Sequence, residues 1–351
     1  MEYKKLGDIA TYINGYAFKP EDRGEEGLPI IRIQDLTGNS YDLGFYDGKY
    51  PEKIEINDGD VLISWSASLG VYVWNRGKAL LNQHIFKVAF DKLDIDKNYF
   101  VYAVRHKLDE MTSKTHGATM KHIVKKDFDA TQIPYPSLEE QAEIASNLDR
   151  VSRIIEARKV ELEKLDELIK ARFVEMFGDP IKNTQNRKTT EFINVVKMQR
   201  GFDLPVQDRQ QDGVIPVYGS NGALDHHNIA KVQGGGIITG RSGTIGRVFY
   251  TEGDYWPLNT SLFSVDTHGN NVIYLAYLLE LFDLTRFVEG TGVPTLNGNM
   301  FQNKQIIVVE LAEQEKFAEF VKQVDKSKYV VQKTLDETRV LFDSLMQKYF
   351  G

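Results

Sequence analysis

The sequence predicts an α/β protein in which two tandem α/β domains are separated by a pair of long antiparallel coiled-coil helices, related by an internal pseudo-twofold repeat. Two observations predict it. Blocks of sequence recur in the same order about 175 positions apart. Two long stretches lack glycine and proline and carry the apolar spacing of a helical seam. We therefore expect globular domains at residues 1–136 and 178–310, and long spacer helices at residues 137–177 and 311–351.

The composition sets the broad class. Of the 351 residues, 42% are hydrophobic and 26% are charged, which is typical of a globular protein without membrane spans. The sequence contains no cysteine, so disulfides and cysteine-ligated zinc are excluded. We find no signal peptide and no apolar run near the ~20 residues of a membrane span, and we expect a cytoplasmic protein without membrane contact. The net charge of −7 argues against simple charge-driven binding of nucleic acid.

The repeat is visible in six blocks that keep their order, at offsets between 173 and 177 positions. A single match of this kind arises by chance, whereas six in order indicate a tandem duplication. Three pairs illustrate the match: "GDVLISWSASLGVYVW" from Gly59 with "GGIITGRSGTIGRVFY" from Gly235, "LLNQHIF" from Leu80 with "PLNTSLF" from Pro257, and "SLEEQAEIASNLDRV" from Ser137 with "ELAEQEKFAEFVKQV" from Glu310.

The glycine-rich stretch "GGGIITGRSG" differs from a phosphate-binding P-loop at one position, where Arg241 replaces lysine. The first copy of the repeat has Trp65 at that position and lacks the preceding glycine. In both copies alternating apolar residues lie before and after the glycines. This pattern predicts two strands joined by a tight turn, with glycine supplying positive φ. A nucleotide site is the weaker alternative, and Arg241 and Arg247 lie near the turn, where they are placed to face a partner.

Two stretches have the features of long helices. Neither Ser137–Phe177 nor Asn299–Phe350 contains glycine or proline. A helix of 41 residues is about 60 Å long at ~1.5 Å per residue, so it must protrude and pair, most simply with its own repeat. The alternative is two separate helices, each folded back on its own domain. The predicted seam consists of Ile144, Leu148, Val151, Leu162, Leu165 and Ile169 in the first stretch, and Val321, Val324, Leu335 and Phe342 in the second.

The layout and two motifs carry a family resemblance. The first helix begins with "IPYPSLEEQAEI" and ends with "ARFVEMFGDP", and the second copy keeps Glu313 and Gln314 at its helix start. The start follows the pattern P-x-L-x-E-Q-x-x-I. Together with the duplicated order of globular half and helix, these motifs resemble the specificity (S) subunit of type I restriction–modification systems over nearly the whole chain.

The resemblance implies a reader of double-stranded DNA without catalytic activity, cofactor or metal of its own. Each globular half is then a target-recognition domain for one half of a bipartite, asymmetric site. The helices hold the halves apart and dock two adenine-methyltransferase (M) subunits, which bring S-adenosylmethionine, while motor-nuclease (R) subunits complete the complex. An adenine-methylation motif of the type N/D-P-P-Y/F is absent, because "GDPIKN" lacks the second proline and the aromatic residue.

Candidate DNA contacts must be sought locally. Residues 1–136 carry 18 basic against 20 acidic side chains, and residues 178–310 carry 11 against 13. Arginine suits guanine and asparagine suits adenine in the major groove, while lysine neutralises phosphate. For each candidate the alternative is an ordinary solvated surface residue. The candidates are Lys114, Lys121, Lys125 and Lys126 in the first half, and Ser220, Asn221, Arg241, Arg247 and Asn259 in the second.

Two other functions compete with DNA reading. One is a non-catalytic scaffold or anti-restriction decoy that occupies methyltransferase subunits. A decoy that mimics DNA needs dense acidic runs along one face, and the sequence has none. The other is a nucleotide hydrolase built on Gly235–Ser242, which the repeat disfavours because the first copy does not keep the glycine.

Overall fold

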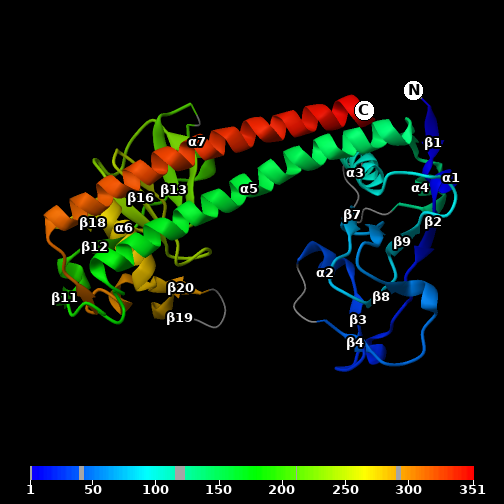
Figure 1. The fold of residues 1–351 in the computed structure, drawn as a ribbon. Coiled ribbons are helices and arrows are strands. Elements are labelled where there is room, and N and C mark those ends of the chain that lie inside the picture. Colours follow the sequence, from blue (N-terminus) through cyan, green and yellow to red (C-terminus); the bar gives the residue numbers. More distant parts are fainter. Residues whose placement is uncertain (1, 39–42, 115–122, 211, 290–293) are drawn as a thin grey trace. The chain divides into compact units, whose positions relative to one another are not determined.

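The computed structural model describes residues 2–38, 43–114, 123–210, 212–289 and 294–351 (Figure 1). The chain forms two compact units: unit 1 comprises Met1–Ala157 with Leu335–Gly351, and unit 2 comprises Arg158–Thr334. The two long helices, α5 (Leu138–Phe177) and α7 (Leu311–Phe350), are each divided between the units. Each unit therefore contains one globular half and one half of each helix. The assignment of residues 1–136 and 178–310 as recognition domains stays a prediction.

Unit 1 is a mixed α/β unit. Its strands are β1 (Tyr3–Lys5), β2 (Thr11–Asn14), β3 (Leu28–Ile31), β4 (Phe45–Tyr46), β5 (Glu55–Ile56), β6 (Val61–Ser64), β7 (Gly70–Val73), β8 (Ala79–Leu81), β9 (Ile85–Ala89) and β10 (Gln132–Pro134). Its shorter helices are α1 (Leu6–Ile9), α2 (Ile33–Thr37), α3 (Lys97–Lys114) and α4 (Lys125–Ala130), with 3₁₀ turns η1 (Pro20–Asp22) and η2 (Glu52–Ile54). The sheet orders are β2-β9-β6-β7, β4-β3-β8-β5 and β1-β10.

Unit 2 repeats this arrangement. Its strands are β11 (Thr189–Glu191), β12 (Lys197–Arg200), β13 (Ile215–Gly219), β14 (Gly222–His227), β15 (Gly236–Gly240), β16 (Val248–Thr251), β17 (Trp256–Pro257), β18 (Ser261–Asp266), β19 (Val288–Glu289), β20 (Thr295–Leu296) and β21 (Gln305–Ile307). Helix α6 (Val272–Phe282) is joined by 3₁₀ turns η3 (Phe192–Asn194), η4 (Val206–Asp208), η5 (Leu284–Phe287) and η6 (Gly298–Met300). The sheet orders are β12-β18-β15-β16, β14-β13-β17, β11-β21 and β19-β20.

The two units share the order of their four-stranded sheet and one parallel strand pair, which confirms the predicted duplication. The sheet β2-β9-β6-β7 of unit 1 corresponds to β12-β18-β15-β16 of unit 2. Each unit also contains one parallel strand pair, β3 with β8 and β13 with β17. In unit 1 this pair aligns Ile30 with Leu80, and in unit 2 it aligns Val217 with Trp256. The fold class predicted from the repeat is therefore confirmed.

The glycine-rich stretch forms a hairpin. Strands β15 and β16 pair antiparallel, with Ile238 opposite Phe249, and no helix follows β15. A P-loop requires a strand that leads into a helix, so the nucleotide site is excluded. The predicted tight turn is wrong, because the strands are joined by a loop over residues 241–247, in which Gly243 and Gly246 have φ of 83° and 95°. The loop contacts the β17–β18 connection, since the Arg241 backbone N–H donates to the Thr260 carbonyl.

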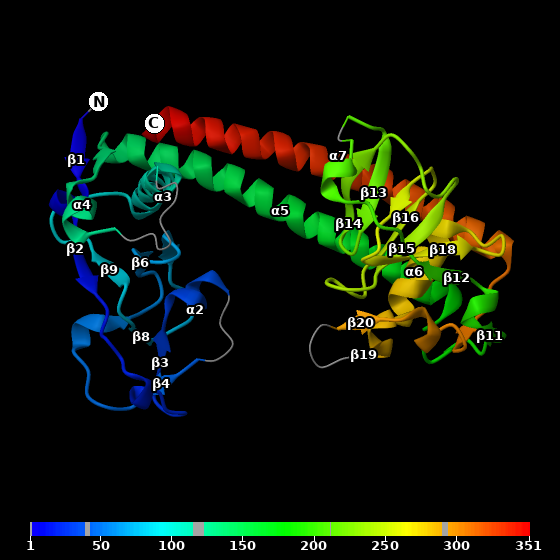
Figure 2. The ribbon, with the colours of Figure 1, turned by 180° about the vertical axis from the view of Figure 1, so that it is seen from behind.

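In unit 1 the beginning of α5 packs beside the end of α7 (Figure 2). Leu148 of α5 shares one buried core with Met346 and Phe350 of α7. The Phe350 ring lies 5.2 Å from the ring of Tyr99 in α3, measured between centroids. Because the first turns of one helix meet the last turns of the other, the two helices are antiparallel within this unit.

In unit 2 the end of α5 packs beside the beginning of α7. Phe173 and Phe177 are fully buried, and both contact the Phe317 ring, with centroid distances of 5.3 and 5.6 Å. The Phe173 ring also stacks on Tyr274 of α6 at 5.7 Å. Pairing between α5 and α7 is thus present in each unit. The alternative of two unpaired helices, each folded back on its own domain, is wrong.

The predicted seam residues lie at different depths. Ile144, Leu148, Val151, Ile169, Val321, Val324 and Leu335 are buried, and Leu162, Leu165 and Phe342 are half-buried. The seam pattern omitted Phe173, Phe177, Met346 and Phe350, which are buried in the cores of the units. Each of these residues lies one residue after a position of the predicted heptad seam. At its ends each helix faces a globular core rather than only its partner helix, so the buried face is wider there than a coiled-coil seam.

Candidate nucleic-acid interface

A groove of about 380 Å³ in unit 1 collects side chains suited to hydrogen bonding. Three connections build it: the start of α2, the β6–β7 turn and the β8–β9 turn. None of its described lining residues is acidic, and amide and guanidinium groups dominate its polar lining. The lining residues are Arg23, Arg32, Ile33, Gln34, Thr37, Ala67, Ser68, Asn82, Gln83 and His84, and we name them the first loop surface.

A buried carboxylate fixes one wall of this groove. Asp35 is 4% exposed, and its Oδ2 accepts from the Arg32 backbone N at 2.7 Å and from the Arg32 Nε at 3.2 Å. The Asp35 carbonyl also accepts from Arg76 Nη2 at 2.8 Å. These bonds cap α2 and hold the Arg32 side chain against the groove wall. An arginine that is already ordered loses little conformational entropy when a ligand arrives.

The β8–β9 turn forms the opposite wall. His84 has a φ of 72°, which is unusual for a residue other than glycine. Its ring packs edge-on to Trp65 at 4.9 Å, and the Trp65 carbonyl accepts from the Ile123 backbone N at 3.0 Å. The Gln83 N–H donates to the Tyr16 carbonyl at 2.8 Å. The backbone of the turn is therefore held in place, while the Gln83 side chain is exposed at the groove.

The five candidates of the second half come together on corresponding connections. Arg247 Nη1 donates to Asn221 Oδ1 at 3.0 Å, which joins the β15–β16 and β13–β14 connections. The Arg241 N–H donates to the Thr260 carbonyl at 2.9 Å, beside Asn259. A Cβ at Gly240 would lie 3.0 Å from the Ser220 carbonyl, so that segment is adjacent too. We name Ser220, Asn221, Arg241, Arg247 and Asn259 the second loop surface.

The two loop surfaces occupy corresponding places in the repeat. The Ile123 N–H donates to the Trp65 carbonyl, and in unit 2 the Leu296 N–H donates to the Arg241 carbonyl at 2.8 Å. Trp65 and Arg241 are equivalent in the duplication, so a returning segment reaches the hairpin at the same place in both units. Among the residues of the second loop surface, Asn259 has an acidic partner, because its amide donates to the Asp203 carboxylate.

Of the four predicted lysines, the two whose side chains are described, Lys125 and Lys126, do not line the first loop surface. Lys121 lies outside the described residues, and Lys114 ends α3 with a side chain outside the described part. Lys125 pairs with Asp129 at 2.8 Å, and Lys126 is exposed on the same short helix, α4. The sequence reasoning missed the groove residues of the first half. The repeat offers a signal for one of them, since Asn82 aligns with Asn259.

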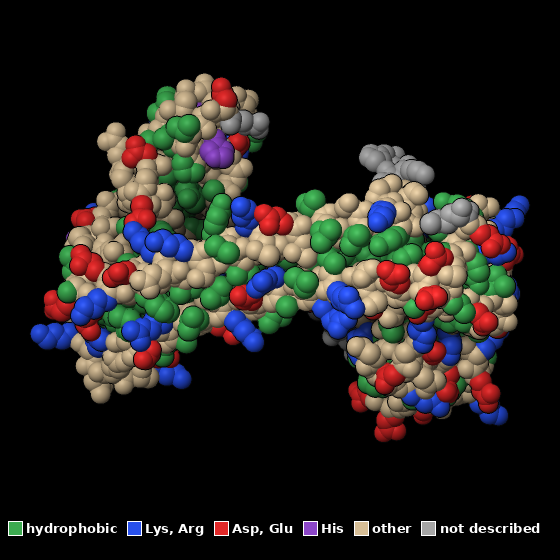
Figure 3. Space-filling model, turned by 45° about the horizontal axis from the view of Figure 1, so that its top comes forward, with side chains coloured by type: hydrophobic (Ala, Val, Ile, Leu, Met, Phe, Trp, Pro, Cys, Tyr) green, Lys and Arg blue, Asp and Glu red, His purple; other side chains and the backbone are tan. Residues whose placement is uncertain are grey.

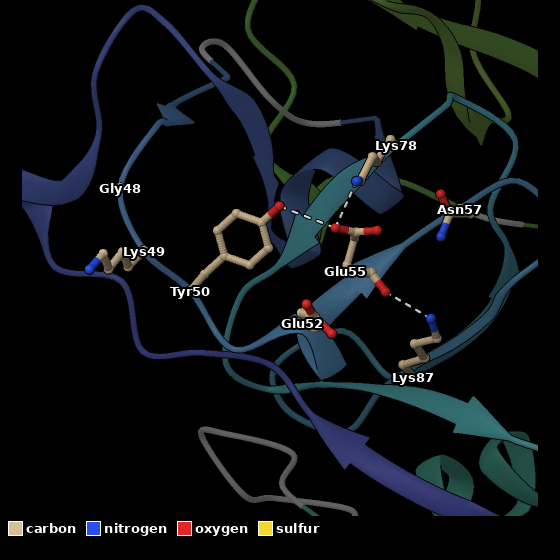
Figure 4. A pocket seen from close by; sticks show the side chains of 8 residues that line it. All are labelled: Gly48, Lys49, Tyr50, Glu52, Glu55, Asn57, Lys78 and Lys87. Carbon is tan, nitrogen blue, oxygen red and sulfur yellow. Dashed lines mark hydrogen bonds and ion pairs between the residues drawn. The ribbon is translucent and has the colours of Figure 1, made fainter.

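A second hollow in unit 1, of about 790 Å³, is lined by lysines and acids (Figure 4). Lys78 Nζ lies 2.9 Å from Glu55 Oε2, and Tyr50 donates to the same oxygen at 3.1 Å. Lys87 Nζ pairs with Asp60 at 2.9 Å. The hydrogen bond from Lys78 lowers the pKa of Glu55, so this carboxylate stays charged near neutral pH. Lysines already paired in this way suit phosphate binding less well than the acid-free groove.

The long helices expose apolar side chains (Figure 3). Tyr329 and Val330 in the unit 2 part of α7 are 73% and 62% exposed. Val340 in the unit 1 part is 70% exposed. A hollow of about 430 Å³ in unit 2 lies next to Val330 and reaches Arg158 and Glu161 of α5. Such exposure on an otherwise well-packed helix pair marks a surface suited to a protein partner.

Within the described part of the chain, every helix is too short or too polar to cross a membrane. The described residues also contain no group of three or more histidine, aspartate or glutamate side chains placed to hold a metal ion.

Comparisons with known proteins agree with the duplicated fold. The family model of the type I restriction modification DNA specificity domain matches residues 1–165 and 181–337. The chain is 29% identical over 168 residues to the specificity subunit of the type I restriction enzyme EcoBI from Escherichia coli, covering 47% of this chain and 35% of that protein. It is 26% identical to the MjaVIII specificity subunit from Methanocaldococcus jannaschii, covering 58% and 49%. The chain thus spans half or less of the length of these relatives.

A solved structure shares the fold. The S subunit of the type I restriction–modification system from M. genitalium aligns over 100% of this chain and 96% of its own, with a TM-score of 0.61 and 16% identity. A chain from a structure of type I restriction–modification assembly and conformational transition aligns over 99% and 97%, with a TM-score of 0.59 and 15% identity. At these identities the likeness concerns the fold.

Proposed function

Because this chain belongs to the type I restriction–modification DNA specificity family, we propose that it reads a bipartite, asymmetric DNA site, with one half-site for each loop surface. The chain is then the non-catalytic specificity subunit of a cytoplasmic complex. Adenine methylation and ATP-dependent cleavage are carried out by the M and R subunits.

The chemistry of the loop surfaces supports this proposal more than any other observation. The first loop surface presents Arg23, Gln34 and Gln83 from a groove without described acidic lining residues. Arginine and amide side chains make the bidentate contacts that distinguish base pairs in the major groove. The second loop surface supplies Arg241 and Arg247 from the β15–β16 loop, which corresponds to the β6–β7 turn of the first loop surface. Two equivalent surfaces on one duplicated chain suit two half-sites.

The overall acidity is compatible with this function. Phosphate contacts provide most of the salt-dependent affinity for DNA, whereas base contacts provide the specificity. A chain with a net charge of −7 gains little from phosphate contacts across its whole surface. We infer that the methyltransferase subunits supply most of the electrostatic attraction, and that this chain supplies base recognition.

The long helices are the proposed docking surface and spacer. The exposed Tyr329, Val330 and Val340 provide apolar area for methyltransferase subunits. Helix α5 is continuous over 40 residues, or about 60 Å at ~1.5 Å per residue. A continuous paired helix is stiff, so its length sets the distance between the readers and hence the spacer between half-sites.

A binding experiment tests the proposal. Fluorescence anisotropy with a duplex that carries the host methylation motif is measured with and without the methyltransferase subunits. We expect specific binding by the complex that weakens about tenfold or more in the Arg241→Ala/Arg247→Ala variant, as two charge-bearing contacts are lost. The control is Lys182→Ala, an exposed basic residue outside both loop surfaces and both long helices. Equal binding of motif and scrambled duplexes by the complex contradicts DNA reading and favours the scaffold or decoy.

A further inference from the structure

A buried glutamine lies in the first turn of each long helix. Gln141 of α5 is 0% exposed and Gln314 of α7 is 1% exposed. A buried amide group carries donors and an acceptor that need partners, because an unpaired polar group in the core is costly. The partners of these two side chains are therefore informative about their role.

In unit 1, Gln141 joins the starts of two helices. Its Nε2 donates to the Pro136 carbonyl at 2.9 Å, just before α5 begins. Its Oε1 accepts from the Asp96 backbone N at 2.9 Å. Asp96 precedes α3, and its carboxylate accepts from the Tyr99 N–H at 2.8 Å in the first turn of that helix. One side chain thus ties the beginning of the long helix to the beginning of a helix in the globular half.

In unit 2, Gln314 makes the equivalent bonds. Its Nε2 donates to the Val309 carbonyl at 2.8 Å, and its Oε1 accepts from the Asn271 backbone N at 2.9 Å. Asn271 is the N-cap of α6, where its side chain accepts from Ile273 N. The Gln314 Nε2 also donates to Asn270 Oδ1 at 2.7 Å, so this unit contains one further bond.

The neighbouring glutamate does not keep its role between the units. Glu140 accepts from the Ser137 backbone N at 3.0 Å, and Glu140 N donates to Ser137 Oγ, which forms a capping box. Glu313 instead pairs with Arg187 Nη1 at 2.9 Å. The glutamine is the member of the pair whose contacts are the same in both units, although the surrounding sequence differs.

We propose that Gln141 and Gln314 are positioning residues that fix the orientation of each globular half on its long helix. Each amide bridges the residue before α3 or α6 and the chain segment that enters α5 or α7. Rotation of the globular half about the helix start breaks these bonds and leaves a partly buried backbone N–H without its partner. The proposal rests on contacts inside each unit and does not depend on DNA reading.

The chemistry of the bridge provides a sharp test. The amide donates with one atom and accepts with another, and leucine does neither. A carboxylate only accepts, whereas a protonated carboxyl group both donates and accepts and so restores the bridge. Gln141→Glu is therefore expected to lose only the bond to the Pro136 carbonyl when ionised, because its carboxylate still accepts from the Asp96 N–H, while Gln141→Leu loses both bonds at every pH. Burial favours the protonated form of the introduced carboxyl group.

Hydrogen exchange at the Asp96 amide measures the bridge directly in the full chain. We expect about tenfold or faster exchange of the Asp96 amide in Gln141→Leu at both pH 8 and pH 5, after correction for intrinsic rates. Gln141→Glu keeps protection at both pH values, because a carboxylate and a protonated carboxyl group both accept from this N–H. Wild type is measured at both pH values, and Gln323→Leu, at an exposed glutamine on α7, is the matched control. The Asn271 amide in unit 2 stays protected throughout.

Two results overturn the proposal. One is wild-type protection at Asp96 in the Gln141→Leu variant. The other is exchange of the Asp96 amide in Gln141→Glu as fast as in Gln141→Leu. Gln314→Leu and Gln314→Glu provide the independent replicate at the Asn271 amide. Because no DNA or methyltransferase is present, failure here leaves the proposed function intact, and failure of DNA binding leaves this result intact.

Discussion

Replacing Leu148 by aspartate is the most direct perturbation of the helix pair. Leu148 is 0% exposed and packs in the core that Met346 and Phe350 complete. Replacing a buried leucine by alanine, which leaves the site apolar but smaller, lowers the free energy of unfolding by about 2–5 kcal/mol in comparable cores. An unpaired carboxylate at the same place adds a desolvation penalty of several kcal/mol, unless it is protonated. We expect a loss of about 4–6 kcal/mol, a large fraction of the ~5–15 kcal/mol that stabilises a typical domain.

Urea unfolding followed by tryptophan fluorescence measures this loss. Trp65 and Trp74 report on unit 1, and Trp256 reports on unit 2. The matched control is Leu341→Asp, the same chemical change at a leucine of unit 1 that is 51% exposed on α7. We expect its stability to change by about 0.5 kcal/mol or less. Equal midpoints for Leu148→Asp and Leu341→Asp would refute the packing described for α5 and α7.

Three further predictions concern the aromatic cores, the Arg187–Glu313 ion pair and the length of α5. Phe177→Ala and Phe350→Ala each remove a fully buried ring, so each should lower the free energy of unfolding in urea by about 3–5 kcal/mol. The first variant should destabilise unit 2 and the second unit 1. Destabilisation of the same unit by both variants would contradict the duplicated packing. The hydrogen bond from Arg187 lowers the pKa of Glu313, so its stabilising contribution is present above the unfolded-state pKa and is lost as the pH falls through the folded-state value. The difference in unfolding free energy between wild type and Glu313→Gln should therefore vanish in acid, and a pH-independent difference would refute this. Inserting four residues after Leu162 lengthens α5 by roughly 6 Å, so the spacer between the half-sites should grow by one or two base pairs. Long-read sequencing of methylated adenines measures the spacer. An active mutant with an unchanged spacer would show that another feature sets the distance between the half-sites.

The sequence predicted the fold because its signals are periodic. Two copies of one unit and two helices without glycine or proline are visible without contacts. The burial of Phe173 and Phe177 could not be predicted from the heptad pattern, because it depends on Tyr274 and Phe317 from distant segments. Tertiary packing widened the buried face of α5 near its end.

The candidate site was predictable only in part. Arg241 and Arg247 are proposed from the sequence because they lie in a recognisable hairpin loop, and their contact with DNA stays a prediction. Arg32 gave no such signal, since its place in the groove depends on a buried contact with Asp35. The lysine-rich segment was chosen for its charge, yet Lys125 is paired with Asp129. Composition identifies basic residues, whereas contacts decide which of them are already engaged.

The central claim is that each loop surface reads one half-site. The most direct measurement is long-read sequencing of methylated adenines in cells that express this chain with its methyltransferase subunits, comparing wild type with Gln34→Ala/Gln83→Ala. Both glutamines are exposed in the groove of the first loop surface, and Gln323→Ala is the control. Each lost base contact removes about 1–3 kcal/mol of discrimination. For Gln34→Ala/Gln83→Ala we predict relaxed specificity in one half-site, with the other half-site and the spacer unchanged. Changes in both half-sites, or an unaltered motif, would contradict it.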